Sequence, residues 1–185
     1  AAAKNQLTQW LKSEPKDVQL LNLAATFQTS QRNFDAAREH IGQALAIRAD
    51  DAATLVNAAR VESAAGQFDT AKTYLERVLS KDPANTQAHL GLAQLALRKG
   101  ELDAAERALL AATQQEPKLI EPKLLLARVQ MRLKKTRDAD RTLTDAAESS
   151  ARRPEVLNAI GLMYLDMGRY DEAISRFRQT IAADA

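Results

Sequence analysis

The chain repeats itself every 34 residues, without insertion or deletion. One series of small residues at this interval comprises Ala37, Ala71, Ala105, Ala139 and Ala173. A second series comprises Ala25, Ala59, Ala93, Ala127 and Gly161. Equal spacing over five copies is typical of a repeat array, in which each unit contacts only its neighbours. We therefore expect a stack of copies with one continuous surface, and we expect function to lie on that surface.

The five copies span residues 18–51, 52–85, 86–119, 120–153 and 154–185, and residues 1–17 fit the second half of the same unit. We expect a single array over residues 1–185. Neither end has a polar capping helix, which solenoids normally require, so we interpret the chain as a fragment of a longer array. The alternative is that the exposed ends pair between molecules.

Each copy carries two blocks of apolar residues at the three- and four-residue spacing of an amphipathic helix. In the second copy the blocks are built around Leu55 and Ala59, and around Leu75 and Val78. The composition is 45% hydrophobic and only 4% aromatic, as expected for alanine- and leucine-rich helices that pack closely. The prediction is an all-α chain of about eleven helices, counting one for residues 1–17.

A short turn separates the two helices of a copy. Its glycine, as in Gly66, Gly100 and Gly168, is expected to end the first helix in a left-handed conformation. The aspartates that follow are expected to cap the second helix, namely Asp69, Asp103 and Asp171. A larger residue at position 24 of each copy is expected to fill the space beside the small residues. These larger residues are Ile41, Leu75, Leu109, Leu143 and Phe177.

This pattern resembles the tetratricopeptide repeat (TPR) family, and the resemblance covers essentially the whole chain. The fifth copy carries the family's motif best, through Gly161, Tyr164, Gly168, Tyr170, Ala173 and Phe177. The resemblance implies a right-handed α-solenoid of tandem helix-turn-helix units. The fourth copy departs from the pattern, with Lys134 in place of the turn glycine and Ala151 in place of the closing proline. We expect a local change of superhelical twist there.

The resemblance also implies that the first helices line a concave face that binds a protein or peptide partner. The candidate binding residues on that face are Asn22, Asn57, Arg60, Leu90, Gln94, Arg98, Leu124, Arg128, Met131, Arg132 and Asn158. Arginines there can bind carboxylates, leucines can accept apolar side chains, and asparagines can hold an extended backbone. The hypothesis is an acidic or amphipathic peptide. The alternative is that these arginines are solvated and pack along their own stems.

Residues that could support catalysis or metal binding do not form a convincing set. His40 and His89 lie on different helix types, and the chain has no cysteine. We predict no enzyme activity, no cofactor and no metal. A net charge of +2 disfavours nucleic acid, and no apolar run approaches the ~20 residues of a membrane span. Trp10 is expected to be buried, because it occupies a packing position of the repeat.

The leading interpretation is a non-enzymatic scaffold that binds a protein partner on its concave face. The alternatives are a structural oligomer that associates through its ends, and a regulatory module whose output domain lies outside this chain. In style the sequence is similar to bacterial TPR arrays of the exopolysaccharide-export or secretion-associated lipoprotein type. That similarity favours a periplasmic or envelope location over a cytoplasmic one, within a multiprotein assembly.

Overall fold

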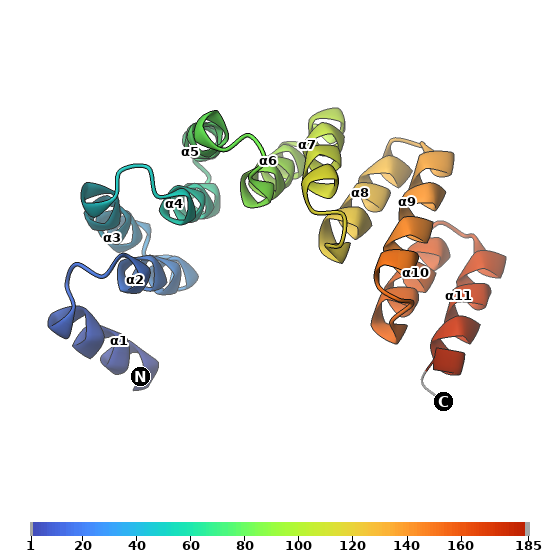
Figure 1. Cartoon of the computed structure of the whole chain (residues 1–185), viewed down its shortest axis with the longest axis horizontal. Helices are drawn as coiled ribbons and strands as arrows, with labels where there is room; N and C mark the ends of the chain where they lie inside the picture. Colours follow the sequence, from blue (N-terminus) through green and yellow to red (C-terminus); the bar gives the residue numbers. More distant parts are fainter. Residues whose placement is uncertain (1, 184–185) are drawn as a thin grey trace. The chain divides into compact units, whose positions relative to one another are not determined.

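The computed structural model describes the backbone of residues 2–183 and the side chains of residues 6, 7 and 9–183. Over this range the chain forms 11 α-helices and no strand (Figure 1). The helices are α1 Ala2–Ser13, α2 Val18–Ser30, α3 Phe34–Ile47, α4 Ala52–Ala64, α5 Phe68–Lys81, α6 Thr86–Lys99, α7 Leu102–Gln115, α8 Ile120–Arg132, α9 Thr136–Ser149, α10 Pro154–Asp166 and α11 Tyr170–Ala183. Residues 1, 184 and 185 of the expected array lie outside the described residues.

The helices keep the period of the sequence. The first helices of the five copies, α2, α4, α6, α8 and α10, begin at residues 18, 52, 86, 120 and 154. These are the expected copy boundaries, each 34 residues after the previous one. The all-α prediction of two helices per copy is therefore confirmed for the described part of the chain.

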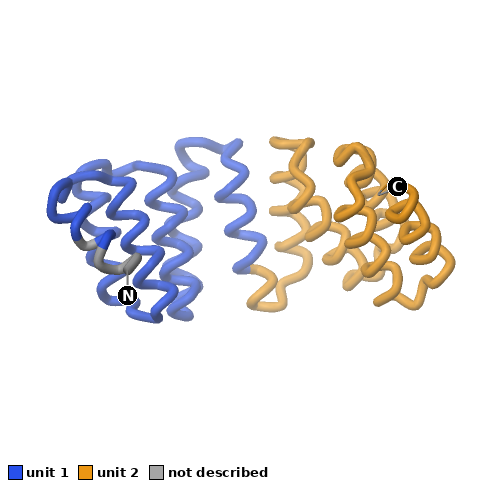
Figure 2. The backbone as a smooth tube through the Cα atoms, turned by 90° about the horizontal axis from the view of Figure 1, so that it is seen from below, with its two compact units in different colours: residues 1–95 blue, residues 96–185 orange. Residues whose placement is uncertain are grey.

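The chain divides into two compact units, residues 1–95 (unit 1) and residues 96–185 (unit 2), with the division inside α6 (Figure 2). In unit 1, α2 pairs with α3 and α4 pairs with α5, while α4 also packs against α2 and α3. In unit 2, α8 pairs with α9 and α10 pairs with α11, while α7 packs against α8. Each unit therefore contains two helix hairpins laid side by side.

The core alternates small and large side chains as expected. The alanines at position 20 of the repeat, from Ala37 to Ala173, are at most 1% exposed. Their larger neighbours Leu75, Leu109 and Leu143 are equally buried. Close approach of paired helices through small residues allows a thin, two-layer core to reach the packing density of a protein interior.

The turns inside each copy confirm the expected role of glycine. Gly66, Gly100 and Gly168 have φ values of 83°, 77° and 71°. The equivalent positions in the first and fourth copies hold Arg32 and Lys134, each with a φ of 60°. A side chain in this region costs roughly 1–2 kcal/mol. The repeat thus imposes the left-handed turn even where the sequence lacks glycine.

The prediction that aspartates of these turns cap the second helices is wrong for α5 and α7. The cap residues are Gln67 and Glu101, and neither makes a side-chain cap hydrogen bond. Asp69 and Asp103 are instead the second residues of their helices. The helices begin one residue before the aspartates, so the carboxylates favour the helix N-terminus through their charge.

Side-chain caps occur instead on the first helices α2, α4 and α6, whereas the cap residues of α8 and α10 make no such bond. Asp17 accepts hydrogen bonds from the backbone N–H groups of Gln19 and Leu20 at the start of α2. Asn85 accepts from the N–H of Ala88 at the start of α6, at 3.0 Å. These caps satisfy backbone donors that have no partner within the helix.

Two further sequence expectations concern single segments. Trp10 is 46% exposed, so the prediction that it is buried is wrong. Leu11 packs on the cluster of Val18 and Leu21, so α1 meets α2 on a side of the helix that excludes Trp10. In the fourth copy Ala151 and Arg152 both have positive φ, 53° and 58°, so this link differs from the others in backbone conformation.

Candidate functional site

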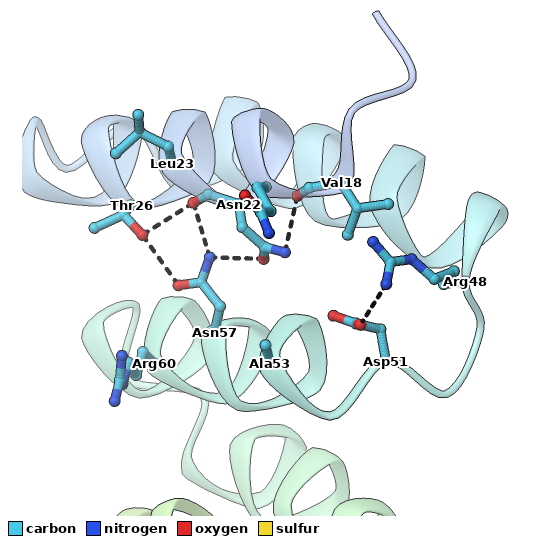
Figure 3. Close-up of a pocket in the computed structure, with 10 residues that line it drawn as sticks. Val18, Asn22, Leu23, Thr26, Arg48, Asp51, Ala53, Asn57 and Arg60 are labelled. Atoms are coloured by element: carbon cyan, nitrogen blue, oxygen red, sulfur yellow. Dashed lines mark hydrogen bonds and ion pairs between the residues drawn. The ribbon is translucent and has the colours of Figure 1, made fainter.

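A pocket of about 360 Å³ lies between α2 and α4 in unit 1 (Figure 3). The residues that line it are Val18, Gln19, Asn22, Leu23, Thr26, Arg48, Asp51, Ala53, Asn57 and Arg60. α2 and α4 are first helices of consecutive copies, so the pocket lies on the helices expected to bind a partner. Three of the predicted site residues, Asn22, Asn57 and Arg60, are brought together here.

Asn22 and Asn57 join the two first helices by a network of hydrogen bonds. Asn57 Nδ2 donates to the backbone oxygen of Asn22 at 2.9 Å and to Asn22 Oδ1 at 3.0 Å. Asn22 Nδ2 donates to Val18 O at 3.0 Å and to Thr54 Oγ1 at 2.7 Å. Thr26 Oγ1 donates to Asn57 Oδ1 at 3.3 Å. The wall of the pocket is therefore fixed by contacts between copies.

This network determines what the two amides can offer a ligand. A side-chain amide has two N–H donors and an oxygen with two lone pairs. Both donors of Asn22 and of Asn57 are engaged within the protein. Each carbonyl oxygen accepts one of these bonds and keeps a second lone pair. Asn57 is buried, at 7% exposed, so the half-buried Asn22 is the amide suited to accept a hydrogen bond from a backbone N–H group of a peptide.

Asp51 holds the start of α4 at one end of the pocket. Its carboxylate accepts from the Thr54 N–H at 2.9 Å and from the Thr54 hydroxyl at 2.6 Å. The hydrogen bond from the Thr54 hydroxyl is the main cause that lowers the pKa of Asp51 below its usual 3.8. Arg48 lies 3.5 Å from the same carboxylate and lowers the pKa further. Arg48 and Asp51 thus largely offset each other in charge.

Arg60 is the cation of this pocket that no carboxylate neutralises within the described residues. Its side chain is exposed, and one guanidinium nitrogen donates to Gln87 Oε1 at 3.2 Å. A guanidinium carries five donors, so several stay available to a ligand. With Arg48 and Asp51 paired, Arg60 gives the pocket a net positive charge.

A second pocket of about 300 Å³ adjoins the other side of α4, toward the start of α6. The residues that line it are Ala52, Ala53, Val56, Arg60, Asn85 and Gln87. Ala53 and Arg60 line both pockets. Ala53 is exposed and has a small side chain, and the exposed Arg60 is available to a ligand in either pocket.

The other predicted residues of unit 1 lie on α6. Leu90 is buried and Gln94 is exposed. Leu90 therefore belongs to the packed interior, while Gln94 can meet a ligand from solvent.

The remaining predicted residues lie in unit 2. Arg128 and Arg132 are exposed and stand one turn apart on α8. Leu124 and Met131, also on α8, are half-buried and pack on the core of α9 and α10. Arg98 at the end of α6 and Asn158 on α10 are exposed. The structure thus brings basic and apolar predicted residues together on α8.

Sequence reasoning missed Arg48, Asp51 and Ala53 as pocket residues. Asp51 precedes α4 at a turn, where the sequence alone indicates a helix cap and not a binding residue. Thr54 identifies Asp51 as this cap in the sequence, because it lies three residues later. At this spacing a cap carboxylate accepts a hydrogen bond from a backbone N–H of the first helical turn. In the described side chains there is no group of three or more metal-ligating residues.

The helix pairs, repeated every 34 residues, define a helical repeat protein. Two TPR family profiles match the chain, over residues 62–121 and 124–185. The chain belongs to the TPR family.

Solved structures of other TPR proteins share the fold. A crystal structure of MamA is similar with a TM-score of 0.68 and 19% identity, covering 86% of this chain and 94% of that one. PilF of Pseudomonas aeruginosa has a TM-score of 0.72 and 16% identity, covering 95% of this chain and 80% of that one. YrrB, described as a TPR protein with an unusual peptide-binding site, has a TM-score of 0.62 and 15% identity. The match covers 96% of this chain and 91% of the YrrB chain.

No curated protein sequence matches this chain significantly. Among the described residues, none of the helices combines the length and the apolar character that crossing a membrane requires.

Proposed function

We propose that the chain is a non-enzymatic scaffold that binds a peptide segment of a protein partner on its first helices. The observation that carries the proposal is the pair of pockets on either side of α4, which share Ala53 and Arg60. A peptide laid across α2, α4 and the start of α6 can place one side chain in each hollow. The description of YrrB as peptide-binding supports the same use of a TPR fold.

The chemistry of the two pockets favours a peptide with an acidic residue between two small side chains. The acidic residue would pair with Arg60, whose guanidinium can bind a carboxylate through two parallel hydrogen bonds. A backbone N–H group of the peptide would donate to the oxygen of half-buried Asn22, while buried Asn57 holds Asn22 in place. The volumes of about 360 and 300 Å³ accommodate side chains and part of the peptide backbone.

α8 in unit 2 offers a further surface of the same kind. Arg128 and Arg132 flank apolar side chains there, as an amphipathic acidic segment requires. We include this surface in the proposal as an independent contact. The proposed setting is a bacterial multiprotein assembly, and its support is that the fold resembles a Pseudomonas aeruginosa protein.

The test begins with a library of random 12-residue peptides panned on the 185-residue chain. Binding of selected peptides is then measured by fluorescence anisotropy. Arg60→Glu should weaken binding by about tenfold or more, because it replaces an attractive charge pair with a repulsive one. Arg107→Glu, which reverses an exposed arginine on α7, serves as the matched control and should change nothing.

The surface on α8 has its own variant in this test, Arg128→Glu. Loss of binding in Arg128→Glu alone would move the peptide site from unit 1 to α8. If neither Arg60→Glu nor Arg128→Glu weakens any selected peptide, the proposed basic binding face is wrong.

A further inference from the structure

The last helix, α11, carries an apolar stripe on its surface. Tyr170, Ile174 and Ile181 are 63%, 48% and 72% exposed, and half-buried Phe177 lies between them in sequence. We call these four residues the α11 stripe. Most apolar residues of similar size in this chain are buried, so a row of them on one helix is unusual.

The preceding copies show what covers this face of a second helix. At the position of Ile174 they place charged side chains, of which Arg38, Glu106 and Asp140 bond to the next copy and Lys72 pairs with Glu76 on its own helix. Arg38 donates to both carboxylate oxygens of Glu62 on α4, at 2.9 and 2.8 Å. Asp140 accepts from Arg169 and from the Tyr164 hydroxyl. Arg38 and Asp140 therefore lie against the first helix of the next copy, and on α11 an isoleucine replaces the charged residue.

The spacing of the stripe indicates the kind of helix that fits it. The steps from Tyr170 to Ile174, Phe177 and Ile181 are four, three and four residues. This is the seam of a two-helix coiled coil, in which apolar residues alternate at these intervals. A helix with the same seam is its natural partner, and the α11 stripe of a second copy is such a helix.

The charged residues beside the α11 stripe favour antiparallel over parallel packing of two α11 helices. Asp171 and Arg178 are exposed, lie next to Tyr170 and Phe177, and have no ion-pair partner in the described part of the chain. In an antiparallel pair, seam-flanking residues at equivalent places meet each other across the interface. Asp171 then meets Arg178 of the partner subunit, and the two-fold axis repeats this ion pair. In a parallel pair these charges would not meet.

We propose that the chain forms a two-fold symmetric dimer in which the α11 stripes of two copies pack antiparallel, flanked by two Asp171–Arg178 ion pairs. This goes beyond the peptide-binding function and uses a different surface. A single pair of 14-residue helices is small for a protein interface. The dimer therefore dissociates on dilution, and its symmetry closes the assembly at two chains.

The first test is sedimentation velocity of the 185-residue chain from about 1 µM to about 1 mM, a range suited to a small interface. A monomer–dimer equilibrium is expected. Ile174→Lys should weaken it at least tenfold. Ile47→Lys, which alters an isoleucine of similar exposure on α3, is the matched control and should leave it unchanged. The proposal is overturned if the chain is monomeric at all concentrations. It is also overturned if Ile174→Lys leaves the dimerisation constant unchanged.

The second test addresses the direction of pairing. Asp171→Arg and Arg178→Asp should each weaken the dimer, and the double variant should restore it. A mixture of the two single variants should form heterodimers, because every ion pair is then complementary. The chain has no cysteine, so Asp171→Cys mixed with Arg178→Cys should also cross-link under oxidation. Failure of both the double variant and the cross-link would overturn the antiparallel arrangement.

Discussion

At the scale of single residues, the two helices of a copy pack through side chains of matched size. A larger side chain on one helix faces a smaller one on the other. In the fourth copy, Ala127 and Leu143 are both fully buried. In the fifth copy the same positions hold Gly161 and Phe177. A Cβ atom added at Gly161 would lie only 2.5 Å from Cε1 of Phe177. The larger ring is therefore accommodated because the facing residue has no side chain.

This matching of sizes predicts the behaviour of Gly161→Ala. Overpacking costs roughly 1–3 kcal/mol, and the better helix propensity of alanine returns up to about 1 kcal/mol. We expect a net loss of about 1 kcal/mol in the free energy of unfolding, measured with urea. Adding Phe177→Leu to Gly161→Ala should restore the lost stability, because residues 161 and 177 then match Ala127 and Leu143 of the fourth copy. Gly42→Ala is the control, since a Cβ there meets nothing within 4 Å and should stabilise.

At the scale of elements, the cap of α4 connects helix stability to the binding face. Asp51 accepts two hydrogen bonds from Thr54 and also lines the pocket between α2 and α4. Because the folded state lowers the pKa of Asp51 below 3.8, the ionised carboxylate stabilises the fold. This contribution is complete above the unfolded pKa and is lost as the pH falls through the folded pKa.

Asp51→Ala should therefore lower the free energy of unfolding by about 1 kcal/mol at pH 7. The difference from wild type should shrink as the pH falls below about 3.8, because the wild-type carboxylate becomes protonated. Urea unfolding of both proteins at several pH values measures this. Asp51→Asn, which keeps an oxygen acceptor but cannot titrate, should show a smaller and pH-independent difference. A constant gap between Asp51→Ala and wild type would contradict the assigned role.

The elements also show how far sequence reasoning extends. The 34-residue period predicted where every first helix begins, because identical spacing of core residues requires identical helix lengths and turns. It did not predict the caps of α5 and α7, since a one-residue change in helix start moves Asp69 and Asp103 inside the helix. The pattern of core residues predicts where a helix begins to within about a residue. The identity of the N-cap residue depends on the backbone conformation at a single position.

The candidate site was less predictable for a related reason. Asn22 and Asn57 were identified as separate ligand groups, but they bond to each other across copies. Asn22 occupies position 5 of its copy and Asn57 position 6 of the next. Whether such residues meet depends on how far neighbouring helices are offset, and the sequence of one copy does not encode that offset. Leu90, predicted to receive a ligand, is buried.

At the scale of the whole molecule, the two proposed surfaces lie on different units and different helix types. The peptide pockets are formed by first helices of unit 1, and the α11 stripe belongs to a second helix of unit 2. Peptide binding and self-association should therefore be independent. Arg60→Glu is expected to leave the sedimentation behaviour unchanged, and Ile174→Lys is expected to leave peptide affinity unchanged.

Hydrogen–deuterium exchange can show whether the face of α2 and α4 binds a peptide. Exchange is compared for the 185-residue chain with and without a saturating panned peptide. The account predicts slower exchange concentrated in α2, α4 and the first turn of α6. Protection confined to unit 2, with α2 and α4 unchanged, would contradict it.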